Sequence, residues 1–355
     1  MKTVKARKSV SRSEKPGVER RGAPSPAAPR RGPSRSSRMA LADAPPRLAR
    51  GPADDSAWPS WLRNELPRIE VALRAVLRRG TGIPRSLREA MHYSLFPGGK
   101  RLRPALAVLG NRVCGGRGRE IYRLAASLEL VHTFTLIHDD LPCMDDDDFR
   151  RGRPSCHKAF GEGLAVLAGD ALLNLAYENV ASLHCAPRRK GEILATLAGA
   201  VGGKGVLGGQ VDDLAAEGRS VSERTLRSIH LRKTASLIAA SLRIGGEMAG
   251  GRRATLHKLD RYGLELGLIF QIVDDLMNLD GTAEDLGRPA GGDERHRKAT
   301  YPRVVGRDAT RRLLAVRVRA ARRDAQGLDR WSPLFVDLVR AVASRVEGGW
   351  PEDET

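Results

Sequence analysis

The chain has 355 residues but no run of about 18 apolar residues, the length that a membrane-spanning helix needs, so we expect no such helix. Aromatic residues make up only 4% of it, and a core built mainly from Leu, Val, Ile and Ala favours helices over sheets. The four cysteines form no Cys-x-x-Cys pair, which argues against a structural zinc site or a disulfide framework. We therefore expect reduced thiols and a cytoplasmic location.

Acidic residues are scarce at the start of the chain. The first 50 residues hold three acids, 14 of the 61 Lys and Arg, and seven of the 20 prolines. Without hydrophobic periodicity, this segment cannot bury enough apolar surface to offset the entropy of ordering it, so we expect residues 1–57 to be a disordered basic tail. Met39 is an alternative start. A nucleic-acid or membrane tether is the other interpretation, but no aromatic residues are interleaved for base stacking. We expect no nucleic-acid partner and no stable membrane insertion.

From Trp58 onward, apolar residues recur at helical spacing. No stretch alternates with period two for long, and no Asn-Gly or Asp-Gly hairpin separates two β-rich runs. The predicted fold class is all-α, with one large helical domain over residues 58–350. The strongest predicted helices lie near residues 121–142, 164–175, 222–247 and 254–279.

The densest charge cluster is Ile-His-Asp-Asp-Leu-Pro-Cys-Met-Asp-Asp-Asp-Asp at residues 137–148, which closes an apolar helix. These carboxylates repel one another, and the helix C-terminus adds partial negative charge. Mg²⁺ resolves this conflict because it prefers oxygen ligands. A solvated acidic loop is the alternative, but Arg150 and Arg151 follow directly and suit phosphate oxygens that a metal also binds.

A second pair, Asp274-Asp275, closes another apolar helix, and Asn278 shares a face with Asp274. Two such helix ends that converge would share one cluster of metal ions. Upstream, Gly98-Gly99 precedes Lys100 and Arg103 without a P-loop pattern, so nucleotide binding is not implied. Taken singly, these basic residues are weak signals.

Together, the motifs resemble the trans-isoprenyl diphosphate synthases, the polyprenyl synthetase family, over roughly residues 60–350. The resemblance rests on motifs in a family-like order: Gly98-Gly99-Lys100 with Arg103, His138-Asp139-Asp140 through Arg150-Arg151-Gly152, Gly209-Gln210, Lys233-Thr234, Phe270-Gln271 with Asp274-Asp275, then Gly287, Lys298 and Tyr301-Pro302.

The resemblance implies a helical bundle of isoprenoid synthase type around a central cavity, with the acidic motifs facing each other across its mouth. It also implies a homodimer and three Mg²⁺ ions, with Mn²⁺ as an alternative. Two ions would bind Asp139 and Asp145, and a third Asp274. The whole metal-ligand set that it implies is Asp139, Asp140, Asp145, Asp274, Asp275 and Asn278.

The implied reaction joins isopentenyl diphosphate head to tail to an allylic diphosphate, dimethylallyl or geranyl, by ionisation, condensation and elimination. Lys233, Thr234 and Gln271 would be the catalytic residues and would also bind substrate. The allylic diphosphate would meet Arg150, Lys233 and Lys298, and Arg288 is a further substrate-binding residue. The isopentenyl diphosphate would meet Lys100, Arg103, His132 and Arg151.

Product length is predicted from the residues before the first acidic motif. Phe134 lies five residues before Asp139, about 7.5 Å along a helix, and could form the floor of the prenyl pocket. This aromatic and the Pro142-Cys143 insertion resemble bacterial farnesyl diphosphate synthases and predict a farnesyl product. Thr135 leaves room beside the ring, so geranylgeranyl diphosphate is the alternative.

Two residues depart from the family pattern. Asn278 replaces an aspartate and could weaken the third metal, whereas Arg288 replaces a lysine and keeps its charge. A terpene cyclase shares the metal chemistry but would not need Lys100, Arg103 and Arg151 for a second diphosphate. A silent partner subunit would be expected to lose the first acidic motif, which is intact.

Overall fold

The computed structural model describes residues 58–79, 82–280 and 298–350, and every structural statement below concerns these ranges. The predicted basic tail, residues 1–57, lies outside the described residues, and so do Gly287 and Arg288.

Helices dominate the described ranges, which confirms the predicted all-α fold class. The elements up to residue 201 are α1 (Ser60–Arg79), α2 (Arg85–Leu95), α3 (Leu102–Val113), α4 (Glu120–Asp139), β1 (Phe149–Arg150), β2 (Arg153–Pro154), α5 (Cys156–Phe160), α6 (Glu162–Ala181) and α7 (Pro187–Val201). Those that follow are α8 (Val206–Ala216), α9 (Glu223–His230), the π-helical segment η3 (Leu231–Ala235), α10 (Ser236–Met248), α11 (Arg253–Asp280), α14 (Tyr301–Val305), α15 (Arg307–Gln326), the 3₁₀ segment η4 (Asp329–Trp331) and α16 (Ser332–Ala343).

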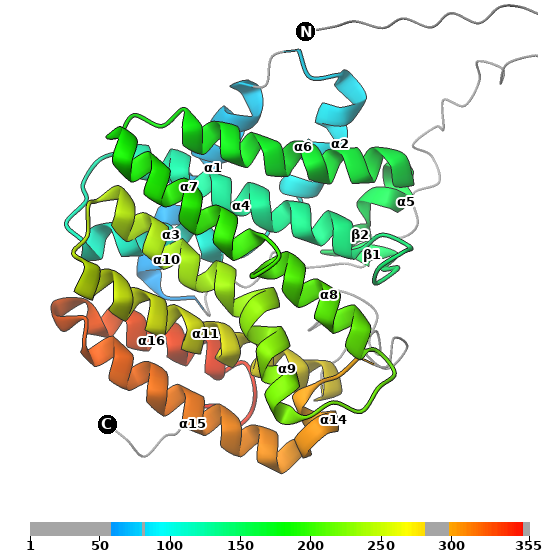
Figure 1. The fold of residues 1–355 in the computed structure, drawn as a ribbon, viewed down its shortest axis with the longest axis vertical. Helices are drawn as coiled ribbons and strands as arrows, with labels where there is room; N and C mark the ends of the chain where they lie inside the picture. Colours follow the sequence, from blue (N-terminus) through cyan, green and yellow to red (C-terminus); the bar gives the residue numbers. More distant parts are fainter. Residues whose placement is uncertain (1–57, 80–81, 281–297, 351–355) are drawn as a thin grey trace, which may run out of the picture. The chain divides into compact units, whose positions relative to one another are not determined.

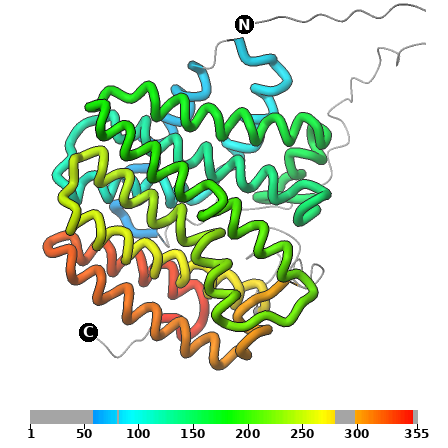
Figure 2. The backbone as a smooth tube through the Cα atoms, in the orientation of Figure 1, coloured from blue at the N-terminus to red at the C-terminus, as the bar shows by residue number. Residues whose placement is uncertain are grey.

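The observed elements match the four predicted helices closely. The helix predicted at 121–142 is α4, which ends at Asp139, three residues earlier; 164–175 lie in α6, and 254–279 lie in α11. Residues 222–247 form α9, η3 and α10, through which the backbone runs without a break (Figure 2). The sequence did not indicate the small antiparallel hairpin, in which Phe149 pairs with Pro154.

Some of the helices form a layer of neighbours. α6, α7, α10, α11 and α15 follow one another in this order, each packed against the next (Figure 1). α3 and α4 pack against this layer, α3 on α10 and α4 on α6. No helix among residues 58–79, 82–280 and 298–350 is both long and apolar enough to cross a membrane.

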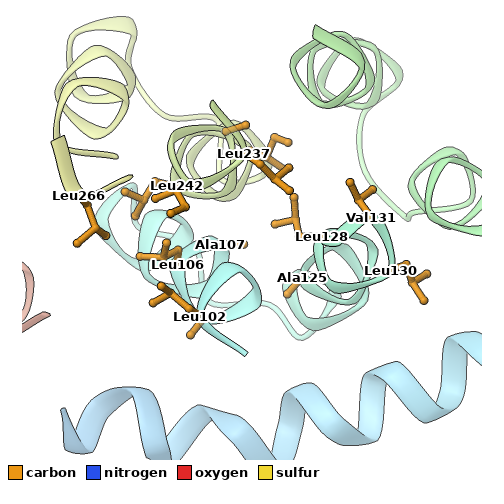
Figure 3. Close-up of a cluster of buried hydrophobic side chains, with 14 of the residues drawn as sticks. Leu102, Leu106, Ala107, Ala125, Leu128, Leu130, Val131, Leu237, Leu242 and Leu266 are labelled. Carbon is orange, nitrogen blue, oxygen red and sulfur yellow. The ribbon is translucent and has the colours of Figure 1, made fainter. Parts of the chain in front are cut away.

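α4 is the central helix of the core. Leu128 and Val131 are fully buried, and apolar side chains cover most of its circumference, as expected for a helix enclosed by others (Figure 3). Glycines let neighbouring helices approach closely: a Cβ at Gly245 would lie 1.9 Å from the Ala107 carbonyl oxygen on α3. Gly245 thus allows α10 to lie directly against α3, which in turn packs on α4.

Candidate active site

The first acidic motif begins at the last residue of α4. The backbone amide of Asp145 donates to the carbonyl of Asp139 over 2.8 Å, and that of Asp146 donates to the carbonyl of Leu141 over 3.1 Å. The loop therefore folds back on the helix end. It brings two carboxylates that are separated in sequence, Asp139 and Asp145, to the same end of α4.

Two lysines from distant segments lie at these carboxylates. Lys298 Nζ is 2.8 Å from Asp145 Oδ2. Lys233 Nζ, in η3, is 2.6 Å from Asp213 Oδ2 on α8, and Asp213 also lies 4.0 Å from Lys298 Nζ. Asp213 was not among the predicted residues, although it follows Gly209 at a spacing that places both on one helix face. We call Asp139, Asp145, Asp213, Lys233 and Lys298 the acidic centre.

Opposite charges stabilise the ionised forms in the acidic centre. Burial raises the pKa of Asp139, and Lys233 opposes that shift. Burial acts in the same direction on Asp145, but Lys298 and Lys233 outweigh it and lower the pKa of Asp145. Burial alone would lower the pKa of Lys233, whereas the carboxylates of Asp213, Asp139 and Asp145 raise it above its usual value. Asp145 and Lys233 are therefore both charged at neutral pH.

A π-helical turn connects the acidic centre to α11. Such turns are frequent at functional sites. A Cβ at Gly209 would lie 2.3 Å from the backbone nitrogen of Lys233, so a glycine allows α8 to approach η3 this closely. The next residue, Thr234, donates to Gln271 Oε1 on α11 over 3.0 Å. η3 thus joins elements that carry the two acidic motifs.

The buried Asp140 pairs with the half-buried Arg150 beside the acidic centre. Arg150 Nε donates to Asp140 Oδ1 over 2.9 Å, and its Nη2 donates to Asp147 Oδ2 over 3.1 Å. Burial alone would lower the pKa of Arg150, but the carboxylates of Asp140 and Asp147 raise it. The predicted metal ligand Asp140 and the predicted diphosphate ligand Arg150 are therefore bound to each other.

In the second acidic motif, Asp275 is fixed by its neighbours. Gln271 Nε2 donates to Asp275 Oδ1 over 2.9 Å, and the backbone amide of Tyr301 donates to Asp275 Oδ2 over 2.9 Å. His230 Nε2 lies 3.7 Å from the same Oδ2 atom. Asp275 thus fastens α14 to α11 and orients Gln271, whose Oε1 accepts from Thr234.

Asp274 and Asn278 lie on another face of α11 and are half-buried. The charge of Asp274 reaches Arg345, which follows α16: burial lowers the pKa of Arg345, and Asp274 opposes this shift. Arg345 was not among the predicted residues, because it lies far in sequence from every motif.

A second charged region surrounds His132 of α4. Burial lowers the pKa of His132 well below its usual value, and the neighbouring cations Arg103 and Arg151 lower it further. Burial, reinforced by Arg151 and opposed by Glu129, lowers the pKa of Arg103 to about 10. Glu129 is also engaged by Arg101, whose Nη1 donates to it over 2.6 Å. We call Arg103, Arg151 and His132 the cationic centre.

The glycine turn before α3 is built against the cationic centre. A Cβ at Gly99 would lie 3.0 Å from the guanidinium carbon of Arg151, and Arg151 Nη1 donates to the carbonyl of Gly98 over 2.5 Å. Lys100 extends from the same turn, and its Nζ lies 5.3 Å from the ring centroid of Trp58. The structure therefore brings Arg103, Arg151 and His132 together and places Lys100 in the turn that contacts Arg151.

The two predicted chain-length residues lie between these centres in sequence. Phe134 is buried, and its ring meets that of His138 edge-on at a centroid distance of 4.8 Å. Thr135 is half-buried, and its hydroxyl donates to the His132 carbonyl over 2.8 Å. That bond occupies the hydroxyl proton of Thr135.

The donor set of the acidic centre fits a hard divalent cation. Its carboxylates supply only oxygen ligands, which Mg²⁺ prefers. Among the described residues, the buried Asp145 Oδ1 finds no hydrogen-bond partner, while Asp145 Oδ2 is held by Lys298. A carboxylate oxygen that is buried and still available is what a metal ligand requires.

The sequence profile described as Polyprenyl synthetase matches residues 84–327. Geranylgeranyl pyrophosphate synthase 12, chloroplastic, of Arabidopsis thaliana is 44% identical over 270 residues, which cover 74% of this chain and 75% of that protein. Farnesyl diphosphate synthase of Geobacillus stearothermophilus is 36% identical over 288 residues, which cover 80% of this chain and 97% of that protein.

Two solved structures resemble the fold. A geranyltransferase from Helicobacter pylori, complexed with magnesium and isoprenyl diphosphate, has a TM-score of 0.70 at 27% identity and covers 81% of this chain and 97% of its own. An FPP/GFPP synthase from Zymomonas mobilis has a TM-score of 0.70 at 32% identity and covers 79% of this chain and 98% of its own.

Proposed function

Since this chain belongs to the polyprenyl synthetase family, we propose that it joins isopentenyl diphosphate to dimethylallyl or geranyl diphosphate and releases farnesyl diphosphate. One observation carries this proposal: α4 bears two charged centres of different character. Asp139, at its end, belongs to the acidic centre, and His132 belongs to the cationic centre. The two residues are about 10.5 Å apart along the helix axis, enough to separate two diphosphates.

The acidic centre would take the allylic diphosphate together with Mg²⁺. Asp139, Asp145 and Asp274 would hold the metal ions, three in number, and Mn²⁺ would serve as an alternative. Asp140, Asp275 and Asn278 would complete this set. When bound, Mg²⁺ supplies positive charge that stabilises the negative charge developing on the leaving diphosphate.

Lys233 and Lys298 would bind the same diphosphate directly. Both are ion-paired with carboxylates, so binding exchanges one anionic partner for another. Arg150 would join them by releasing part of its contact with Asp140. Arg288 would bind as well, although it lies outside the described residues. Preorganised positive charge of this kind lowers the barrier because it needs no reorganisation as the bond breaks.

The cationic centre would take isopentenyl diphosphate without a metal. Arg103 and Arg151 can each present a guanidinium fork to phosphate oxygens, and Lys100 adds a point charge. Burial lowers the pKa values of Arg103 and His132, and the guanidinium of Arg151 lowers both further, so a bound diphosphate would supply negative charge to a buried basic region. A terpene cyclase, which ionises a single diphosphate, would have no use for this centre.

Breakage of the allylic C–O bond gives a carbocation and a diphosphate anion. Attack by the double bond of isopentenyl diphosphate forms the new C–C bond, and a proton then leaves to the released diphosphate. Thr234 and Gln271 would present oxygen dipoles to the cation, and Gln271 is oriented for this by its bond to Asp275. Apolar helix walls would exclude water from the cation.

The farnesyl product is proposed from Phe134, whose buried ring would limit the length of the prenyl tail. Geranylgeranyl diphosphate is a second candidate, favoured by the 44% identity to a geranylgeranyl pyrophosphate synthase against 36% to a farnesyl diphosphate synthase. Incubation with labelled isopentenyl diphosphate, Mg²⁺ and each allylic primer, followed by product sizing, tests both. A C15 product supports our proposal, a C20 product supports the alternative, and no elongation with any primer contradicts the function.

We also propose that the protein is a homodimer that acts in the cytoplasm. Large apolar side chains are exposed on α6 and α8, among them Leu167 and Val211 at 56% and 65%. Light scattering would test the dimer, and localisation of a tagged chain the compartment. Residues 58–350 would form the catalytic domain, so removal of residues 1–57 should leave turnover unchanged.

A further inference from the structure

A cluster outside the acidic centre brings together an imidazole and two carboxylates. One ligand atom from each of Asp146, Asp148 and His157 lies within 4.8 Å of the others. The side chains of Asp146 and Asp148 are 54% and 62% exposed, whereas Asp145 is buried against Lys298. The backbone of Asp146 has a φ of 42°, which reverses the chain between Asp145 and this cluster.

His157 is the residue that distinguishes this cluster from an ordinary acidic surface. Its side chain is only 2% exposed, and its Nδ1 lies 3.0 Å from Ser155 Oγ. Within the described part of the chain, its Nε2 has no hydrogen-bond partner; Asp146 Oδ1 is 4.0 Å away. A buried polar atom left unpaired is unfavourable. A gap of this size is too long for a hydrogen bond. Two ligand atoms bonded to a tetrahedral ion at about 2.0–2.2 Å lie about 3.4 Å apart, so a shift of the exposed Asp146 side chain by about half an ångström would let both atoms bind one ion.

The local fold holds these groups in place without an ion. The Ser155 amide donates to the Asp148 carbonyl over 2.9 Å, which fixes the backbone of Asp148 beside the start of α5. Ser155 Oγ fixes the ring of His157 through Nδ1, the kind of outer contact that orients metal-bound histidines. Lys158 Nζ lies 2.8 Å from Asp148 Oδ1, and at 44% exposure it can move into solvent when another cation binds.

We propose that Asp146, Asp148 and His157 form a separate binding site for a first-row transition cation such as Zn²⁺, Co²⁺ or Mn²⁺. Imidazole nitrogen suits these ions, whereas Mg²⁺ prefers an all-oxygen set. The site does not require a diphosphate, because the protein supplies three ligands. Its ion would join the loop that carries Asp145 to α5, and so stabilise the acidic centre from outside.

Cobalt absorption tests this proposal on the full-length protein, stripped of metal and free of diphosphate. Titration of Co²⁺ in excess Mg²⁺ should give visible bands that saturate at one ion per chain. Asp148→Asn and His157→Gln should each weaken this binding at least about tenfold. Because Asp148 is exposed, its variant folds even if His157→Gln does not.

Asp139→Asn is the matched control, because it alters the acidic centre and leaves the cluster intact. It should bind Co²⁺ with the affinity and stoichiometry of the parent protein. A titration that is lost in Asp139→Asn, or unchanged in Asp148→Asn, overturns the proposal. Either result leaves the prenyltransferase proposal standing, since no substrate is present in this assay.

Discussion

Replacement of Gly209 by alanine should disable the acidic centre without touching a charged residue. The added Cβ would lie 2.3 Å from the backbone nitrogen of Lys233 and 2.8 Å from the carbonyl carbon of Arg232. Both obstructing atoms belong to the backbone of η3, so no side-chain rotation can relieve the clash. α8 must therefore move away from η3 by about 1 Å to reach the 3.4 Å of ordinary contact.

That movement has two consequences of predictable size. Overpacking of this kind costs about 1–3 kcal/mol of stability. It also separates Asp213 Oδ2 on α8 from Lys233 Nζ, which are 2.6 Å apart in a direct ion pair. A misplacement of about 1 Å at a catalytic group can cost about a hundredfold in rate. We expect Gly209→Ala to lose about that factor in kcat/KM for the allylic substrate.

Gly199→Ala is the matched control, since Gly199 also lies within a helix, α7. A Cβ there would meet no heavy atom of the described residues within 4 Å, so this variant should gain about 0.5–1 kcal/mol from helix propensity. Chemical denaturation and steady-state kinetics measure both variants. If Gly209→Ala were as stable and as active as Gly199→Ala, the close approach of α8 to η3 would not matter, and our reasoning would be refuted.

Three further changes have defined outcomes. Phe134→Ala should lengthen the product by opening the pocket floor, and an unchanged chromatogram would reject that role. Asn278→Asp should lower the Mg²⁺ concentration for half-maximal rate because it adds a charged ligand; an identical Mg²⁺ curve would contradict this. Burial lowers the pKa of His230 to about 4, so its contribution to stability is complete above pH 6.5 and is lost as the pH falls from 6.5 towards 4. Between pH 7 and pH 5, the free energy of unfolding should therefore fall by about 2 kcal/mol more in the parent protein than in His230→Phe. An equal fall in both proteins would contradict this role of His230.

The helices were predictable because apolar residues recur at helical spacing in the sequence, and the candidate site residues were selected because they occur in short motifs. The structure brings Thr234 and Gln271, which belong to different motifs, into direct contact, and their catalytic role stays a prediction. Asp213 could not be selected in the same way. Its ion pair with Lys233 depends on how closely α8 approaches η3 at Gly209, and that distance is set by tertiary packing.

The sequence also did not indicate that adjacent acidic residues of one motif make different contacts. Asp274 and Asp275 differ by about 100° around α11, so they meet different surroundings. Asp275 accepts the backbone amide of Tyr301, whereas Asp274 lies near Arg345. Likewise, Asp140 binds Arg150 while its neighbour Asp139 is near Lys233. The sequence motif identifies the cluster of acidic residues, but tertiary packing decides which contacts each carboxylate makes.

The most direct test of two separate diphosphate centres on α4 compares Arg103→Gln with Lys233→Gln by steady-state kinetics. We predict that Arg103→Gln raises KM for isopentenyl diphosphate at least about tenfold and leaves KM for the allylic substrate near its parent value, since removing a charged partner costs about 1.5–3 kcal/mol. Lys233→Gln should show the reverse. If both variants raised both constants equally, the two centres would be one site, and the account would be wrong.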